Sequence, residues 1–237
     1  MKRKLLLVFS LSAMIALSSC NSAQVVQQNN VRNVEVRVDQ NSYLNFVTPA
    51  DLNKAFEAAD LACVNNPNIT DEELEIIIVS SLKDSAVNHS VDEIYYPGGT
   101  NRTEFWLSIK HPVAAFKVKN CADKALQKSE ELYDDTYKGN GDAFRHCYWN
   151  ILMVKAIGKD LTEKFATAHE ADSPEGVDKE MDLNNNSKCR EWADSLENND
   201  DAIINAVIEH VNNGDLLRII NVNGVEKLVP TTNENRK

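Results

Sequence analysis

The chain has 237 residues, with 25 Lys and Arg against 36 Asp and Glu, which gives a formal net charge of −11 at pH 7. A surface this acidic repels nucleic acid and anionic lipid headgroups at long range, so we expect no nucleic-acid partner. With 43% hydrophobic residues, the chain is long enough to bury one substantial core.

The first twenty residues are typical of an export signal. Met1–Lys4 is basic, and Leu5–Leu17 is an apolar run too short to span a membrane as a mature helix. The run ends in Leu17-Ser18-Ser19-Cys20, which resembles the lipobox of bacterial lipoproteins. The resemblance implies that residues 1–19 are a signal peptide and that Cys20 carries acyl chains such as palmitate. Such chains would anchor the protein in the bacterial cell envelope, at the outer membrane or on the surface or periplasmic face. A plain secretory signal is the alternative.

The segment after the signal is polar. Residues 20–46 are rich in Asn, Gln and Ser and are expected to be a tether, with Val34, Val36 and Val38 alternating as a short strand would. A single α-helical domain is expected over 47–230, followed by a tail over 231–237.

Helix-start signals recur in the first half of this domain. They comprise a Thr-Pro pair at 48–49, a capping box at Thr70–Glu73 and a proline at 112. The signals predict helices over 49–63, after Thr70, and from Pro112 to a stop at Gly139-Asn140-Gly141.

The second half reads as a helical hairpin and then a β-hairpin. Helices are predicted over 142–157 and 160–171, with Gly158 between them, and over 200–212. Two apolar runs flank Asn223-Gly224, which is a typical two-residue hairpin turn. The expected fold is therefore mainly α: a multi-helix domain with a small C-terminal β-hairpin.

The helix predicted over 142–157 has no solvated face. One face holds Phe144, Cys147, Tyr148, Ile151 and Leu152, and the other combines Asp142, His146 and Asn150 with Trp149 and Met153. A helix that is apolar on both sides should be buried on both sides, and unpaired buried polar groups cost about 1–3 kcal/mol each. We therefore expect a polar site at His146. The alternatives are a capping role for Asp142, an ion-pair role for Arg145 and a structural role for His146.

A second histidine lies on the following helix. His169 shares a stripe with Leu161, Phe165 and Ala168 and should point toward the core. Two histidines on adjacent helices favour a shared site, in which His146 and His169 would bind a divalent metal such as zinc or calcium, or orient water. Glu170 would be a further metal ligand or a general base, with a solvated helix face as its alternative.

Asp182-Leu183-Asn184-Asn185-Asn186 alternates oxygen donors as the start of an EF-hand loop does. The pattern then departs from a calcium loop, because Ser187 replaces the required Gly and Ala193 the bidentate Glu. An Asn-rich turn is the alternative, from which Asp182 and one amide could still reach the histidines as ligands.

Four cysteines remain after Cys20, which suggests disulfides in an exported chain. We prefer the pairs Cys63–Cys121 and Cys147–Cys189, the second of which would link the Asn-rich segment to the 142–157 helix. Four free thiols are the alternative. A thiolate zinc site is not expected, because the sequence has no CxxC spacing.

The ordered set Asp142-Ala143-x-Arg145-His146, His169-Glu170 and Met181-Asp182-x-x-Asn185-Asn186 resembles an uncharacterised bacterial domain. That domain occurs in secreted and surface proteins and at the ends of polymorphic-toxin-like chains. The resemblance covers residues 139–220 and brings no reaction with it. It implies one signature set: Asp142, Arg145, His146, His169, Glu170, Asp182, Asn185 and Asn186. Cys189 stands where the family usually has Gly. A weaker likeness, to small helical bacterial phospholipases A2, lacks the Asp that follows the histidine there.

These patterns favour a membrane-anchored hydrolase in which His146 and His169 hold a metal or orient water. Glu170 or Asp182 would be a base or ligand, and Arg145 would hold an anionic substrate group or an oxyanion. Two other classes stay open: a non-catalytic envelope lipoprotein whose polar residues form a buried structural network, and a phospholipase A2-like or toxin-like effector.

Overall fold

A computed structural model of the chain describes residues 42–87, 102–171 and 173–237. Four predictions concern residues outside these ranges: the signal peptide, the acylation of Cys20, the part of the tether up to residue 41 and the short strand at Val34–Val38. No helix within the described ranges is both long enough and apolar enough to cross a membrane. The described residues form two compact units, 42–102 and 103–237, within the span predicted as one domain.

The first unit is a helical hairpin preceded by a short 3-10 helix, η1 (Ser42–Phe46). Helix α1 (Pro49–Asn65) begins at a capping box in which the Thr48 amide donates to Asp51 Oδ2 at 2.8 Å. Helix α2 (Asp71–Val87) has the same device at its start, where the Thr70 amide donates to Glu73 Oε2 at 2.8 Å. Both helix starts agree with the sequence prediction, because a capping box is a purely local signal.

The second unit holds the other helices and the hairpin. They are α3 (Arg102–Lys110), α4 (Pro112–Leu132), α5 (Asn140–Ile157), α6 (Lys159–His169), α7 (Val177–Trp192), the 3-10 helix η2 (Ala193–Ser195), α8 (Asp200–Asn213), β1 (Leu217–Val222) and β2 (Val225–Pro230). The strands pair antiparallel, with Val222 opposite Val225, and the turn residues Asn223 and Gly224 have φ of 54° and 84°. Two positive φ values are what a two-residue hairpin turn needs, so the predicted mainly α fold with a C-terminal β-hairpin is confirmed.

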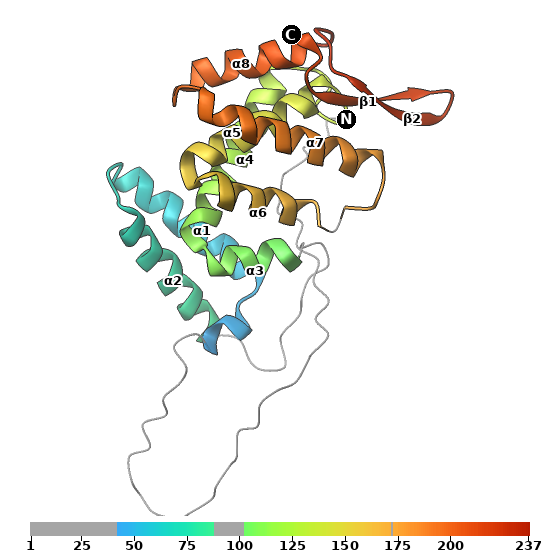
Figure 1. The fold of residues 1–237 in the computed structure, drawn as a ribbon. Helices are drawn as coiled ribbons and strands as arrows, with labels where there is room; N and C mark the ends of the chain where they lie inside the picture. Colours follow the sequence, from blue (N-terminus) through green and yellow to red (C-terminus); the bar gives the residue numbers. More distant parts are fainter. Residues whose placement is uncertain (1–41, 88–101, 172) are drawn as a thin grey trace, which may run out of the picture. The chain divides into compact units, whose positions relative to one another are not determined.

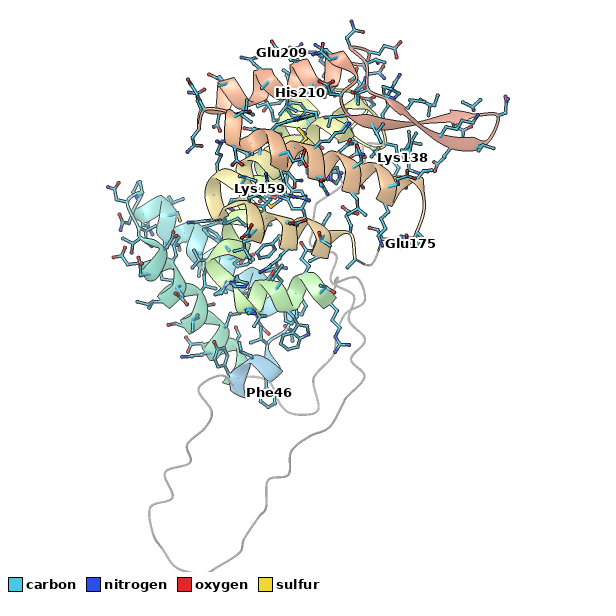
Figure 2. All side chains as sticks on the ribbon, in the orientation of Figure 1. Phe46, Lys138, Lys159, Glu175, Glu209 and His210 are labelled. Carbon is cyan, nitrogen blue, oxygen red and sulfur yellow. A yellow bond between two sulfur atoms is a disulfide. The ribbon has the colours of Figure 1, made fainter. Side chains whose placement is uncertain are left out.

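Helix α5 is the central helix of this unit and packs against α4, α6, α7, α8 and β1 (Figure 1). Fourteen of its residues are buried, among them apolar and polar side chains from both faces. By contrast, Lys159, Glu175 and Glu209 on other segments of the unit are exposed, and Glu175 and Glu209 lie at its margin in Figure 2. The prediction that this helix is buried on both sides therefore holds.

The start of α5 differs from the prediction. Gly139-Asn140-Gly141 does not end the preceding helix, because α4 ends at Leu132 and α5 begins at Asn140. The carboxylate of Asp135 takes the place of a cap and accepts the amides of Asn140 at 2.9 Å and Gly141 at 3.1 Å. A Cβ on Gly141 would lie 2.9 Å from the carbonyl oxygen of Asp135, so glycine allows this close approach.

The predicted tail is held to the same helix start. The side-chain amide of Asn140 donates to the carbonyl oxygen of Glu234 at 2.8 Å, and the Thr232 amide donates to Asn140 Oδ1 at 3.0 Å. The last residue, Lys237, is held at the end of α4, where its amide donates to the carbonyl oxygen of Leu132 at 2.8 Å. The residues after β2 thus fix the end of α5 that carries Asp142.

Candidate metal centre

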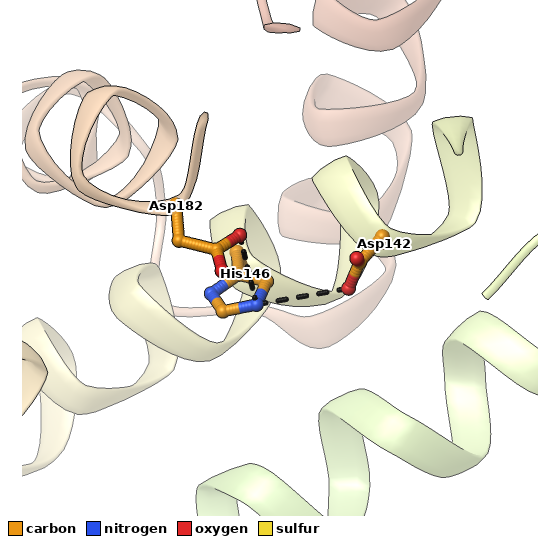
Figure 3. A group of neighbouring side chains, drawn as sticks. All are labelled: Asp142, His146 and Asp182. Atoms are coloured by element: carbon orange, nitrogen blue, oxygen red, sulfur yellow. Dashed lines mark ion pairs between the residues drawn. The ribbon is translucent and has the colours of Figure 1, made fainter. Parts of the chain in front are cut away.

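Two turns of α5 and one turn of α7 bring together three side chains that could hold a metal ion (Figure 3). Asp142 and His146 are four residues apart on α5 and therefore share one face, while Asp182 reaches them from α7. The Nε2 atom of His146 lies 3.3 Å from Asp182 Oδ1 and 3.6 Å from Asp142 Oδ1. The ligand atoms of all three residues lie within 4.8 Å of one another.

The tautomer of His146 follows from a chain of hydrogen bonds that starts at Arg190. The guanidinium of Arg190 can only donate, so the Asn150 atom 3.3 Å from it is an oxygen. The amide nitrogen of Asn150 then donates to the carbonyl oxygen of His146 at 2.9 Å and to Asn186 Oδ1 at 2.6 Å. The orientations of both amides are thereby fixed.

Because Asn186 presents an oxygen, the Nδ1 atom of His146 at 3.3 Å from it must carry the proton. Burial, together with the nearby Arg145 charge, lowers the pKa of His146 to about 3, so the imidazole is neutral at pH 7. The Nε2 atom consequently keeps a lone pair, which accepts a hydrogen bond from Arg145 Nη2 at 2.8 Å, and the two carboxylates lie 3.3 and 3.6 Å from the same atom. A neutral imidazole oriented through its other nitrogen is the form in which histidine binds metals.

Replacing Asn150, the middle residue of this series of hydrogen bonds, tests the tautomer assigned to His146. Asn150→Ala is expected to lower the free energy of unfolding by about 1–3 kcal/mol, because buried partners lose their hydrogen bonds. It should also let the His146 ring populate both tautomers, whereas the unchanged protein shows one, protonated at Nδ1. Nitrogen-15 NMR of the histidine rings measures the tautomer, and urea unfolding measures the stability.

Ser129→Ala is the matched control, because it removes a different buried hydrogen bond, from Ser129 Oγ to the carbonyl oxygen of Gly141 at 2.6 Å. It should cost stability without changing the His146 tautomer. An unchanged protein whose His146 is protonated at Nε2 would contradict the assignment.

The two carboxylates of the group are held differently. Asp142 is buried, but Arg145 and the backbone amide of Lys138, 2.6 Å from Asp142 Oδ2, outweigh the burial and hold its pKa below the usual value. Asp142 is therefore ionised. The fork of Arg145 contacts the other oxygen, with Nε at 3.2 Å from Asp142 Oδ1.

Asp182 lacks such support. Burial raises its pKa to about 8, and the neighbouring carboxylates of Glu170 and Asp142 add to the rise. Among the described residues, none donates a hydrogen bond to its buried Oδ1 atom. A buried carboxylate oxygen without a donor, facing an imidazole lone pair, is an arrangement that a cation would stabilise.

The structure does not bring His169 into this group. Its Nδ1 atom lies 3.5 Å from Glu104 Oε2 on α3, and its ring meets that of Trp149 edge-on with centroids 5.2 Å apart. The ring of His146 also lies edge-on to Trp149, at 6.3 Å. Both histidines thus contact one indole, but they have different carboxylate partners. Burial opposes protonation of His169, yet Glu104 and Glu170 outweigh it and raise its pKa.

Glu170 also lies outside the three-residue group. It is 3% exposed, and its Oε2 atom accepts a hydrogen bond from Ser173 Oγ at 3.0 Å, while Oε1 has no hydrogen-bond partner among the described residues. Its charge raises the pKa of Asp182, so it lies within electrostatic range of the group.

The Asn-rich segment is not a turn, and it is not a calcium loop. Residues 182–186 are part of helix α7, so the alternating oxygens point around the helix instead of toward one ion. Asp182 and Asn186 share the face toward His146. Asn185 points away and pairs with the backbone of Leu217 in β1, donating to its carbonyl oxygen and accepting from its amide at 2.9 Å each.

One disulfide joins the two helices of the group. Cys147, next to His146, is bonded to Cys189, three residues after Asn186, and both side chains are fully buried. This is the link between the Asn-rich segment and α5 that the sequence suggested. The suggested Cys63–Cys121 bridge is not formed: both thiols are free, and they belong to different units of the chain.

Three contributing residues were not assigned a role from the sequence: Asn150, Arg190 and Glu104. Asn150 follows His146 by four residues, and Arg190 follows Asn186 by four, so each lies one helical turn from a residue already singled out. Helical spacing could have pointed to these two. Glu104 has no such signal, since it reaches His169 from a separate helix.

The fold and site therefore define a helical domain with a buried Asp–His–Asp group on its central helix. Residues 105–215 match a protein family described as Domain of unknown function (DUF6973), so a DUF6973 domain is found there, and it contains all three residues of the group. Comparison with curated proteins and with solved structures finds no match.

Proposed function

We propose that this protein is a lipid-anchored bacterial envelope protein whose DUF6973 domain binds a divalent transition-metal ion through Asp142, His146 and Asp182 and acts as a hydrolase. The observation that carries the proposal is the position of His146 Nε2 within 3.6 Å of two carboxylates, one of which has a buried oxygen that receives no hydrogen bond from any described residue. One imidazole with two carboxylates suits zinc, manganese or iron better than calcium, which prefers oxygen ligands alone.

Three protein ligands leave a coordination position for water, as catalytic zinc sites do. An ion bound there would supply a hydroxide nucleophile near neutral pH and polarise a carbonyl or phosphoryl oxygen. Glu170, buried near Asp182 and with no hydrogen bond to Oε1 from the described part of the chain, is proposed as the general base. Arg145 is proposed to hold an anionic substrate group at the partly exposed edge of the site.

Metal titration tests the binding step. The full chain without residues 1–19 is expected to bind one equivalent of zinc, and His146→Ala is expected to weaken binding by a factor of about 100 or more, because the remaining carboxylates lose their nitrogen ligand. Calorimetry with a competing chelator measures the dissociation constant, and hydrolysis of ester and phosphoester substrates is followed in parallel.

His210→Ala is the matched histidine control. The His210 ring stacks on Trp192 and pairs with Asp215 at 2.8 Å, so its loss should leave zinc affinity unchanged. A protein that binds zinc no more tightly than its His146→Ala variant would sink the metal-site proposal.

The anchor is a separate part of the proposal and rests on the lipobox at residues 17–20. Acyl chains on Cys20 would hold the protein at the membrane, and Cys20→Ser should then move it to the soluble fraction. Equal membrane fractions for the two proteins would count against the anchor while leaving the metal site untouched.

A second candidate function is a non-catalytic envelope protein. It is favoured by the closed chain of buried hydrogen bonds from Arg190 through Asn150 and Asn186 to His146, which a purely structural network would also contain. The stability of an Asp182→Asn variant in EDTA and in zinc separates the two candidates.

A further inference from the structure

We infer that the guanidinium of Arg145 is the resident cation of the Asp142–His146–Asp182 group and that a metal ion enters by displacing it. The inference rests on the proposed metal binding and concerns how the same site is regulated. In this role Arg145 competes with the metal ion for the site and does not help it to bind.

The contacts of Arg145 overlap with those that an ion would need. Its Nη2 atom lies 2.8 Å from His146 Nε2 and also donates to Asp142 Oδ1. The proton of His146 is on Nδ1, so Nε2 has a single lone pair, and in this structure Arg145 uses it. A metal ion needs the same lone pair at about 2.0–2.1 Å. The guanidinium and the ion therefore exclude each other at this atom.

Arg145 can leave without dismantling the site. Its side chain is 19% exposed, against 4% for Asp142 and 3% for His146. The ligands keep other partners when it goes, since Asp142 Oδ2 accepts the Lys138 amide and His146 Nδ1 donates to Asn186. Arg145 is also a long side chain that can carry its charge outward to solvent.

The charges explain why a resident cation is present. Asp142 and Asp182 place carboxyl groups within 3.6 Å of His146 Nε2 in one buried region, where an uncompensated charge on Asp142 would be costly. Arg145 offsets this charge while no ion is bound, and an incoming ion takes over that role. Once displaced, the guanidinium would lie at the edge of the site, where the proposed anionic substrate enters.

The test is a zinc titration of three proteins: unchanged, Arg145→Gln and Arg145→Lys. Arg145→Gln is expected to tighten zinc binding by about 10- to 100-fold, because charge-assisted hydrogen bonds no longer compete with the ion. Arg145→Lys keeps the charge but loses the fork that joins both ligand atoms, so it should tighten binding too, by a smaller factor.

Several outcomes would overturn the inference. Weaker or equal binding by Arg145→Gln would make Arg145 a helper or a bystander. Tightening by Gln but not by Lys would show charge repulsion without occupancy. If no protein binds zinc, Arg145→Gln included, both the inference and the proposed function fail, whereas binding by the unchanged protein with no gain in Arg145→Gln removes the inference alone.

A second readout follows Arg145 directly in the unchanged protein. The Nε proton of Arg145, bonded to Asp142 at 3.2 Å, should exchange slowly with solvent in the zinc-free protein and rapidly after zinc is added. Nitrogen-15 NMR of the arginine side chains measures this exchange. Continued protection with zinc bound would show that Arg145 stays in place, which contradicts displacement.

Discussion

Removing the Cys147–Cys189 disulfide is expected to lower the free energy of unfolding by about 4 kcal/mol, because the bridge closes a loop of 42 residues and so restricts the unfolded chain. Both cysteines are also fully buried, so water does not fill the space that the two sulfur atoms leave. The bridge ties α5 beside His146 to α7 near Asn186, and its loss should loosen the 3.3 Å contact between those two residues. Metal affinity should therefore fall along with stability.

Urea unfolding of the double variant Cys147→Ala, Cys189→Ala measures the effect. Cys121→Ala is the control, since it removes a partly buried cysteine that is free, and it should cost no more than about 1 kcal/mol. If the double variant and the control unfolded at the same urea concentration, the bridge would have no stabilising role.

The parts of the fold that could be predicted are those fixed by neighbouring residues. The capping boxes at Thr48 and Thr70 and the turn at Asn223-Gly224 need no information beyond four adjacent residues, and the structure has them where the sequence places them. The burial of α5 on both faces was also visible, because the sequence offers it no polar side.

Helix α7 could not be predicted in the same way. Asn184, Asn185 and Asn186 disfavour a helix, because their side chains compete for backbone hydrogen bonds. In the folded chain the side chains of Asn185 and Asn186 have other partners: Asn185 bonds to Leu217, 32 residues away, and Asn186 to His146, 40 residues away. Tertiary contacts thus removed the competition that makes asparagine a poor helix former, and no local pattern shows such contacts.

At the site, too, local patterns could be read from the sequence, whereas contacts between helices could not. The sequence drew attention to His146 and Asp182, and the structure brings them together with Asp142. The sequence alone could not show that Trp149 would lie against both histidines or that Glu104 on α3 would pair with His169. The packing of the helices decides which carboxylate lies beside each histidine. The spacing of residues along one helix does not reveal this packing.

Asp182→Asn is expected to stabilise the metal-free protein by on the order of 2–4 kcal/mol at pH 7. Below the ordinary pKa of 3.8, Asp182 is protonated in both the folded and unfolded states and has no effect on stability. As the pH rises from 3.8 to about 8, the unfolded chain loses this proton while the folded chain keeps it, so the stability of the unchanged protein falls across that window. Asparagine has no such proton to lose, and the advantage of the variant therefore grows with pH.

Zinc should reverse the order of the two proteins. At a zinc concentration about 1,000 times the dissociation constant, binding adds about 4.1 kcal/mol to the unchanged protein, or roughly 8–16 °C in melting temperature. Asp182→Asn gains little, because a neutral amide is a poor metal ligand. Melting in EDTA and in zinc between pH 5 and 9 measures both effects, with the exposed Glu197→Gln as a control that should follow the unchanged protein.

The two candidate functions differ in what they expect of Asp182. A functional site can contain a residue that lowers the stability of the metal-free protein, whereas a residue of a structural network should raise it. If Asp182→Asn melts below the unchanged protein in EDTA at every pH, the buried group is a structural network and the non-catalytic envelope protein becomes the favoured function.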